Sequence, residues 1–336
     1  MQLSSDNLKW QCSLIIPAYN ESKNILNCLD FIVDSISLNV EVLIINDGST
    51  DDTELLILDF IKTNKTENIH YFKQENKGAA SARLFGIEKA STEYIAFLDC
   101  DDSLNKSSIH NAMSKFFENE EIDFVLFDYY SVSESNVHQR FSYSVNTWPI
   151  TGLEAFSNTI EYWGIHAFGI YRRSTILAGY ELYAEIKRYD HDINNVNDDE
   201  LIARCAMLSC RLVTLSSGQY FYSPNDDSTT RRLNKNLFKM AYTTMSLRDL
   251  IASRDTLLFL KPALNLYILR VSTNLSIKHY KWRKELSNNG YWVSAISMLI
   301  NAVNVKDLFS YLTRKPLLLT WSMFKYLYIW IVYAWR

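Results

Sequence analysis

Three carboxylates stand within four residues, at Asp99, Asp101 and Asp102, directly after the apolar run 94–98. The run predicts a buried strand, and carboxylates crowded at its end repel one another unless a cation offsets their charge. Mg²⁺ and Mn²⁺ prefer oxygen ligands and keep coordination positions open for the phosphates of a nucleotide. The segment therefore predicts a divalent cation at the end of this strand. The alternative is an acidic turn that caps the next helix.

A second polar group follows the apolar run 41–45, where Asp47 is next to Gly48. An aspartate at a strand end accepts hydrogen bonds from a uracil-like imide or a ribose, and glycine allows close approach of the backbone. A capped helix start accounts for the same residues. Further along, Arg83 in the small-residue run 76–83 is expected against a base or phosphates, although a basic residue on a helix is usually just solvated.

A late acidic run, Asp198, Asp199 and Glu200, precedes an amphipathic stretch. One interpretation is a helix N-terminus, where the helix dipole favours negative charge. The other is a general base that takes a proton from an attacking hydroxyl. The polar loop expected at 220–232 carries two arginines that could meet phosphates.

Apolar and amphipathic runs alternate along the chain and predict the elements that position these residues. The expected strands are 13–16, 41–45, 69–72, 94–98, 124–130 and 212–215, and the expected helices are 24–37, 51–62, 78–90, 107–118 and one from 199. The pattern indicates an α/β fold with a doubly wound, mostly parallel sheet, followed by a mainly helical region from residue 234 onward. Ligands bind at the carboxyl ends of the strands in such a sheet, so the polar groups are expected to converge on one site.

The composition excludes several classes of protein. Of 336 residues, 48% are hydrophobic and 14% aromatic, which suffices for a core and excludes intrinsic disorder and collagen-like repeats. The five cysteines lie apart, at Cys12, Cys28, Cys100, Cys205 and Cys210, without the CxxC pairs typical of zinc or redox sites. We therefore expect a reducing compartment. The first residues are polar and carry no signal-like apolar run, so we expect no export.

Charge is divided unevenly along the chain. Residues 231–336 contain 17 Lys and Arg against 4 Asp and Glu, whereas residues 1–230 contain 17 against 34. A basic and aromatic segment suits an anionic membrane surface, although a solvated helical face is the plainer interpretation. No nucleic-acid recognition motif accompanies it, so we expect no nucleic-acid partner. The stretch 316–336 is expected to lie in the membrane interface, with a spanning or a packed helix as alternatives.

Five segments, in order along residues 1–230, resemble the GT-A glycosyltransferases of family 2, inverting enzymes that use nucleotide sugars. They are residues 15–21, 45–53, 76–83, 98–102 and 198–201. The resemblance implies a GT-A, Rossmann-like fold. It also implies a transfer in which the acceptor hydroxyl attacks the anomeric carbon from the face opposite the nucleotide. The resemblance does not extend to the C-terminal segment.

The resemblance assigns a role to each matching residue. Asp47 would contact the uracil, Asp99 the ribose or donor sugar, and Asp101 a Mn²⁺ or Mg²⁺ ion, with Asp102 beside it at the metal. The set implied around the nucleotide sugar is Pro17, Ala18, Tyr19, Glu21, Asp47, Lys77, Arg83, Asp99, Cys100 and Asp101.

The resemblance also implies Asp199 as the catalytic base. The chain departs from the family pattern at two positions. Leu84 stands where the family often has Asn, and Asp198 stands where the family usually has Glu. Because the late run holds three adjacent carboxylates, Asp198 and Glu200 remain alternatives for the base.

The resemblance and the basic tail together imply work at a membrane. Bacterial members often extend polyprenyl-diphosphate-linked oligosaccharides for O-antigen or capsule, so we expect such an acceptor and a UDP-hexose or UDP-N-acetylhexosamine donor. The expected location is the cytoplasmic, inner face of the cell membrane. A nucleotidyltransferase on a similar sheet and a catalytically silent membrane scaffold are the alternative functions.

We expect two domains. Residues 1–232 form the catalytic domain, with a nucleotide-binding half at 1–105 and an acceptor half at 106–232, and residues 233–336 form the membrane-associating region.

Overall fold

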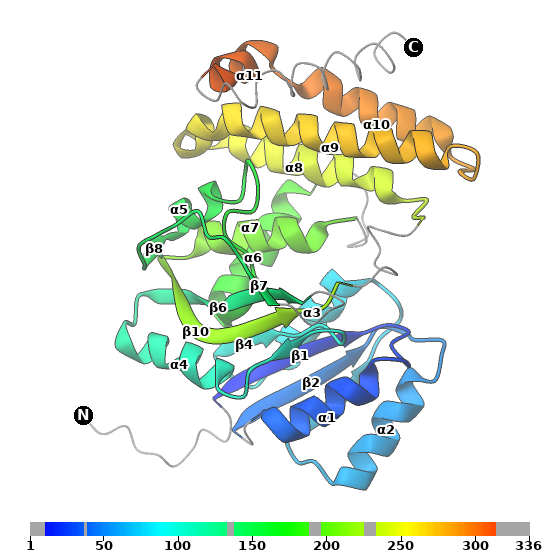
Figure 1. Cartoon of the computed structure of the whole chain (residues 1–336), viewed down its shortest axis with the longest axis vertical. Helices are drawn as coiled ribbons and strands as arrows, with labels where there is room; N and C mark the ends of the chain where they lie inside the picture. Colours follow the sequence, from blue (N-terminus) through cyan, green and yellow to red (C-terminus); the bar gives the residue numbers. More distant parts are fainter. Residues whose placement is uncertain (1–10, 37–38, 133–137, 188–195, 225–232, 314–336) are drawn as a thin grey trace. The chain divides into compact units, whose positions relative to one another are not determined.

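The computed structural model describes residues 11–36, 39–132, 138–187, 196–224 and 233–313 (Figure 1). The chain divides into two compact units that alternate along the sequence. The first comprises residues 1–156, 164–182 and 202–225, and the second comprises 157–163, 183–201 and 226–336. The helix expected at 316–336 and the two arginines of the expected loop, at 231 and 232, lie outside the described residues.

One mixed sheet forms the first unit. Among the described residues it has ten strands, and its main path runs β3-β2-β1-β4-β9-β6-β10-β5. The strands with parallel neighbours are β1 (Cys12–Ala18), β2 (Val40–Asn46), β3 (Ile69–Lys73), β4 (Tyr94–Phe97), β6 (Ile122–Val132) and β10 (Leu212–Tyr222). The antiparallel additions are β5 (Ser103–Leu104), β7 (His138–Arg140), β8 (Ile150–Thr151) and β9 (Gly169–Arg172). The predicted α/β fold with a mostly parallel sheet is confirmed.

Helices cover both faces of this sheet. Side chains alternate between the two faces along each strand, so neighbouring residues of one strand contact different helices. Leu14 and Ile16 of β1 belong to the buried cluster that also contains residues of α1 (Ile25–Ser35), α2 (Thr53–Asn64) and α4 (Ser108–Glu118). Ile15 points the other way, toward α3 (Ala79–Lys89). A Cβ atom at Gly86 would lie only 2.5 Å from Cγ2 of Ile15, so glycine permits this close approach.

The four antiparallel strands were not predicted, and a predicted strand is longer than expected. The strand expected at 212–215 continues as β10 to Tyr222, so residues 220–222, expected in a loop, are strand. Tyr220 pairs with Tyr129 of β6 and with Leu104 of β5, and it is fully buried. β9 was not predicted, and it enters between β4 and β6. Both features depend on partners distant in sequence, which local periodicity does not register.

The second unit is helical, as predicted for the chain from residue 234. Its helices are α8 (Met240–Ser253), α9 (Lys261–Trp282), α10 (Asn289–Ala302) and α11 (Val305–Leu312). Within the described residues, none of the helices is both long and apolar enough to span a membrane.

Earlier segments of the chain complete this second unit. The carbonyl of Glu161 accepts a hydrogen bond from Nη1 of Arg270 at 2.6 Å, and its carboxylate accepts one from the hydroxyl of Tyr311 at 2.5 Å. The carbonyl of Val196 accepts a hydrogen bond from Oγ1 of Thr243 at 2.9 Å. Glu161 and Val196 are therefore bound to helices of this unit.

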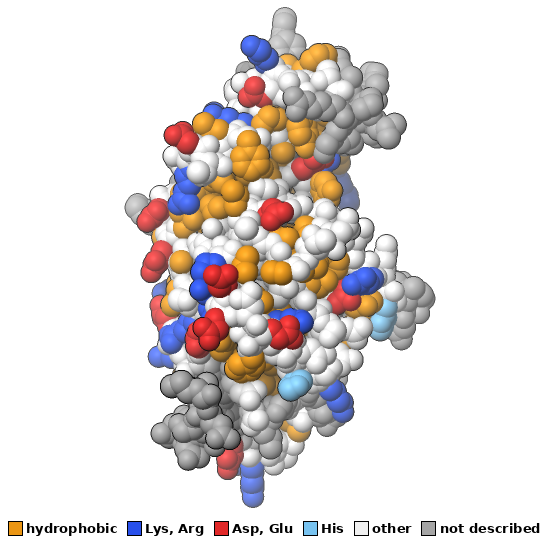
Figure 2. Space-filling model, turned by 90° about the vertical axis from the view of Figure 1, so that its left-hand side faces the viewer, with side chains coloured by type: hydrophobic (Ala, Val, Ile, Leu, Met, Phe, Trp, Pro, Cys, Tyr) orange, Lys and Arg blue, Asp and Glu red, His pale blue; other side chains and the backbone are white. Residues whose placement is uncertain are grey.

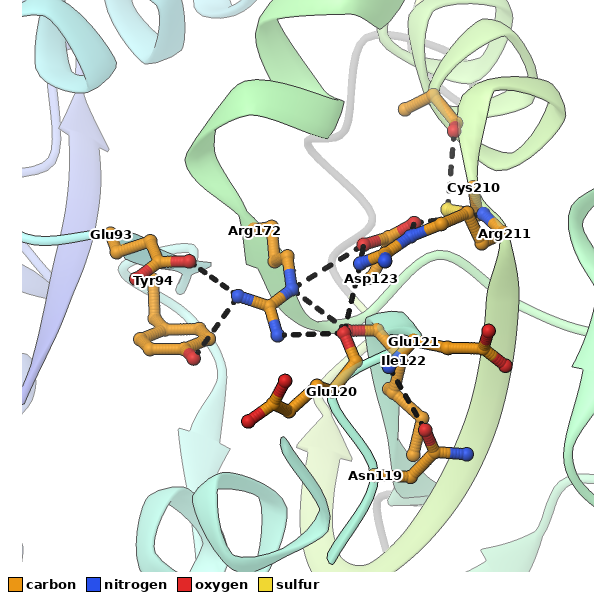
Figure 3. Close-up of polar contacts among 11 residues, drawn as sticks. Glu93, Tyr94, Asn119, Glu120, Glu121, Ile122, Asp123, Arg172, Cys210 and Arg211 are labelled. Atoms are coloured by element: carbon orange, nitrogen blue, oxygen red, sulfur yellow. Dashed lines mark hydrogen bonds and ion pairs between the residues drawn. The ribbon is translucent and has the colours of Figure 1, made fainter. Parts of the chain in front are cut away.

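A network of ion pairs joins the starts of β6 and β10 to the end of β9 (Figure 3). Asp123, whose side chain is 6% exposed, accepts hydrogen bonds from Nη2 of Arg211 at 2.6 Å and from its backbone N–H at 2.8 Å. Nε of Arg172 lies 3.3 Å from the same carboxylate, and this guanidinium also binds Glu93 and the hydroxyl of Tyr94. Arg172 thus connects β9 to Glu93 and Tyr94 on the side of β4 and to Asp123 on the side of β6.

We predict that Arg172→Met destabilises the first unit by about 3 kcal/mol, because it leaves a buried carboxylate with one partner fewer. The free energy of unfolding from a urea titration measures the loss. The matched control is Lys115→Met, which breaks an exposed i,i+3 pair with Glu118 on α4 and is expected to cost less than about 1 kcal/mol. Equal losses in the two variants would contradict the prediction.

Candidate functional site

The loops after β1 and β2 are tied together by side chains that bind backbone groups. The backbone N–H of Asn20 donates to Oγ of Ser49 at 3.0 Å, and Oδ1 of Asn20 accepts from the N–H of Thr50 at 2.8 Å. The N–H of Glu21 donates to Oγ1 of Thr53 at 2.8 Å. Asn20 has a φ of +57°, a conformation that asparagine tolerates better than most residues. The two loops therefore form one rigid edge at the carboxyl ends of β1 and β2.

Asp47 shapes the next loop. Its carboxylate, which is 3% exposed, accepts hydrogen bonds from Nε2 of Gln74 at 2.7 Å and from the N–H groups of Lys77 at 2.9 Å and Gly78 at 2.7 Å. Gly78 has a φ of +86° and precedes α3. The carboxylate thus sets the path of residues 74–78. The contact between Asp47 and a uracil stays a prediction.

Arg83 lies beside the acidic turn after β4. Nη2 of Arg83 donates to Oδ1 of Asp99 at 2.7 Å, and its guanidinium carbon lies 6.0 Å from the ring centroid of Phe97. This ion pair brings the motif on α3 to the motif that follows β4. The thiol of Cys100, which is buried, donates to the carbonyl of Pro17 at 3.6 Å and brings in the β1 loop.

Asp102 differs from its neighbours because it is buried, with 6% of its surface exposed. Its Oδ2 accepts from the hydroxyl of Tyr220 at 2.5 Å, and its Oδ1 accepts from the N–H of Ser223 at 2.9 Å. Burial, together with the charges of Asp99 and Asp101, raises the pKa of Asp102 to about 8. Sequence reasoning did not find Tyr220 or Ser223, because they lie more than a hundred residues downstream.

Negative charge accumulates at this edge of the sheet. Burial raises the pKa of Glu21, and the charges of Asp101 and Asp99 raise it further. Among the described residues, no three His, Cys, Asp or Glu side chains gather into a metal-binding group. Mg²⁺ is commonly held by only one or two carboxylates together with substrate phosphates. The charge crowding therefore fits a divalent cation held by Asp101 and a diphosphate.

The remaining predicted residues lie on the same loops. Ala18 is buried, Tyr19 is 46% exposed, and Lys77 is exposed. The structure thus brings four of the five predicted segments, those of Tyr19, Asp47, Arg83 and Asp101, to one edge of the first unit. Their assignment to a nucleotide sugar stays a prediction.

The fifth segment belongs to the second unit and opens α7 (Asp198–Ser209). Asp198 is buried at 2% exposure, whereas Asp199 is exposed. Glu200 accepts hydrogen bonds from Nε1 of Trp163 at 3.3 Å and from Nδ2 of Asn197 at 3.2 Å. The assignment of Asp199 as the base, with Asp198 and Glu200 as alternatives, stays a prediction.

An aromatic cluster surrounds the ends of β6 and β10, and sequence reasoning missed it. Its members are Tyr129, Phe141, Tyr143, His166, Phe168, Tyr220 and Tyr222. Nδ1 of His166 accepts from the N–H of Phe168 at 3.2 Å, so Nε2 carries the proton and donates to the hydroxyl of Tyr143 at 2.9 Å. Burial lowers the pKa of His166 to about 3, so the ring is neutral in the folded protein.

Known proteins are similar to this chain in sequence and in fold. Residues 13–177 match the model of glycosyl transferase family 2. An uncharacterized glycosyltransferase of Rickettsia bellii is 37% identical over 143 residues, which cover 42% of this chain and 19% of that protein. The minor teichoic acid biosynthesis protein GgaB of Bacillus subtilis is 24% identical over 266 residues, which cover 75% of this chain and 28% of GgaB. The chain thus spans less than a third of the length of either relative.

A solved structure extends the similarity to both units. Residues 1–349 of TarS from S. aureus, in complex with UDP-GlcNAc, superimpose with a TM-score of 0.62 at 21% identity. The match covers 95% of this chain and 89% of that one. At this identity the likeness shows the fold, a GT-A sheet followed by a helical region.

We predict that His166 makes stability fall as the pH drops from 7 to 5. Its folded pKa lies far below the unfolded value of about 6.5, so in this window the unfolded state binds more protons. One such histidine contributes a slope of at most about 1.4 kcal/mol per pH unit. Urea titrations across this range should show a flatter profile for His166→Gln, whereas His110→Gln, at an exposed position on α4, should keep the original slope. Parallel profiles for the two variants would contradict the assignment.

Proposed function

The chain belongs to glycosyltransferase family 2, and we propose on that premise that it transfers a sugar from a nucleotide sugar to an acceptor hydroxyl with inversion at the anomeric carbon. One observation carries the proposal. The Asp47 loop, the Arg83–Asp99 pair and the acidic turn meet at one edge of the sheet in the first unit. Ligands of open α/β sheets bind at this edge.

The proposed donor is a UDP-hexose or a UDP-N-acetylhexosamine. The loop that Asp47 orders presents Lys77 as an exposed cation, and Arg83 lies one helix turn further along α3. The TarS structure, which shares the fold, is a complex with UDP-GlcNAc, and this supports uridine as the base and an N-acetylhexosamine as the sugar.

A Mn²⁺ or Mg²⁺ ion is part of the proposal, with Asp101 as its ligand and Asp102 beside it. When bound, such an ion offsets the charge that develops on a departing diphosphate. Asp99 is paired with Arg83 and, as proposed, lies against the ribose or donor sugar. In this proposal Asp99 contacts the ribose or donor sugar, whereas Asp101 and Asp102 lie at the metal ion beside the phosphates.

The proposed base is Asp199. It is exposed at the N-terminus of α7, whereas Asp198 is buried and Glu200 is partly buried. In an inverting transfer the base removes the proton of the acceptor hydroxyl as its oxygen attacks the anomeric carbon. The bond between the acceptor oxygen and the anomeric carbon forms while the bond between that carbon and the diphosphate oxygen breaks.

The proposed acceptor is a polyprenyl-diphosphate-linked oligosaccharide of O-antigen or capsule type, reached at an anionic membrane surface. The end of α9 supports this location. Ile277 and Tyr280 are 60% and 64% exposed there, and the guanidinium of Arg283 lies 3.9 Å from the ring centroid of Tyr280. Figure 2 shows that apolar side chains are exposed among charged ones on one face of the molecule as well. The name of GgaB also points to a bacterial surface polymer.

We predict UDP release when the full chain is incubated with a UDP-sugar and Mn²⁺, tested over a panel of UDP-, GDP- and dTDP-sugars. EDTA should abolish release, and Asp101→Asn should slow it at least about a hundredfold. Asp199→Asn should slow transfer about a hundredfold or more while UDP binding stays unchanged. Asp59→Asn, an exposed carboxylate on α2, is the matched control.

Other outcomes would separate the alternative functions. Release of sugar 1-phosphate, with transfer of the uridylyl group to the acceptor, would indicate a nucleotidyltransferase. Full activity in Asp101→Asn and Asp199→Asn would refute the assigned roles. Absence of UDP binding with Mn²⁺ in calorimetry would overturn the proposed function and favour the alternative of a catalytically silent membrane scaffold.

We predict that the chain sediments with vesicles of phosphatidylcholine and phosphatidylglycerol more than with vesicles of phosphatidylcholine alone. Reversal of charge at Lys278, Lys281, Arg283 and Lys284 should reduce binding more than about tenfold, because each basic residue near an anionic surface contributes about 1 kcal/mol. The control reverses Lys62, Lys65, Lys89 and Lys106, exposed basic residues of the first unit. Equal loss of vesicle binding in both variants would contradict the proposal that the end of α9 binds the membrane.

A further inference from the structure

We infer that Tyr220 is a positioning residue, whose hydroxyl holds Asp102 and, through it, the acidic turn of residues 99–102 in the geometry that receives the donor diphosphate. The inference rests on the proposed function. It concerns a residue outside the five segments that carry the family resemblance.

The contact is direct and buried. Tyr220 has no exposed surface, and its hydroxyl donates to Oδ2 of Asp102 at 2.5 Å. Its ring lies against Phe168, with centroids 4.4 Å apart, and near Phe127 at 6.4 Å. The ring is therefore fixed by packing, and the hydroxyl is the part that reaches the turn.

The backbone around Tyr220 holds the same turn. Tyr220 pairs with Leu104, and the N–H of Asn105 donates to the carbonyl of Gln219 at 3.1 Å. The N–H of Ser223 donates to Oδ1 of Asp102 at 2.9 Å. The end of β10 thus meets the segment that follows the acidic turn at several points.

The geometry explains why a buried aspartate needs this hydroxyl. Asp102 is 6% exposed, and the Tyr220 hydroxyl and the Ser223 N–H each bind one of its two carboxylate oxygens, so loss of the hydroxyl would leave one buried oxygen without this donor. The N–H of Asp102 donates to the carbonyl of Asp99 at 3.1 Å and closes the turn, so movement of Asp102 would displace its neighbours. Asp101, adjacent in sequence, is partly exposed, where a diphosphate can reach it.

A purely structural role for Tyr220 is the alternative, and Tyr171 provides its control. Tyr171 is 1% exposed, lies on β9 of the same sheet, and donates its hydroxyl to the carbonyl of Ala167 at 3.0 Å. Tyr171→Phe and Tyr220→Phe each remove one buried tyrosine hydroxyl, which binds the carbonyl of Ala167 in the first case and Asp102 of the acidic turn in the second.

The test compares binding of UDP with Mn²⁺ to binding of uridine, which lacks phosphates, by calorimetry on the full chain. Tyr220→Phe should weaken UDP binding about tenfold and slow sugar transfer about ten- to hundredfold, because it leaves a buried oxygen of Asp102 without its hydrogen-bond donor. Uridine binding should stay within threefold of the original, as should all three quantities in Tyr171→Phe. Thermal unfolding of both variants verifies that they fold.

A double-mutant cycle with Asp102→Asn tests the route of the effect. If Tyr220 acts through Asp102, then Tyr220→Phe should add little to the loss already present in Asp102→Asn. Additive losses, equal weakening of UDP and uridine, or identical behaviour of the two tyrosine variants would overturn the inference. Failure of the original protein to bind UDP would instead overturn the proposed function on which it rests.

Discussion

Repulsion between like charges at the carboxyl edge of the sheet is the constraint around which the rest of the first unit is organised. Glu21 and Asp102 lie at this edge with Asp99 and Asp101, and the charges of these two aspartates raise the pKa of both Glu21 and Asp102. The fold tolerates these carboxylates because different groups of the protein interact with different members of the set. Arg83 forms an ion pair with Asp99, the Tyr220 hydroxyl and the Ser223 N–H bind Asp102, and Asp101 is partly exposed.

Rigidity at this edge comes from polar side chains that bind backbone, in addition to the apolar core. Asn20 joins two loops by hydrogen bonds in both directions, and Asp47 supplies three acceptor contacts to a third loop. Buried carboxylates of this kind are expensive unless every oxygen is bound, so each loop has one preferred path. A site preorganised in this way spends little binding energy on ordering itself around a ligand.

Much of this arrangement was predicted from local sequence, and the parts discussed here that were not predicted depend on contacts between residues far apart in the chain. Strands such as β1 and helices such as α4 follow from apolar runs and spacing within a dozen residues, so their positions were predictable. β9 and the extension of β10 through Tyr220 depend on partners far along the chain. The same distinction separates the aspartates of the turn, visible as a motif, from the tyrosine that holds one of them, which no local pattern marks.

The alternation of the two units along the sequence has a consequence for how this chain can be divided. Glu161 and Val196 come early but are bound by Thr243, Arg270 and Tyr311 of the helical unit. A fragment that ends at residue 225 would retain the early segments and lose all three of these side chains. Chimaeras between relatives should therefore exchange residues 157–163 and 183–201 together with the C-terminal helices, since a single crossover point would separate partners that fold together.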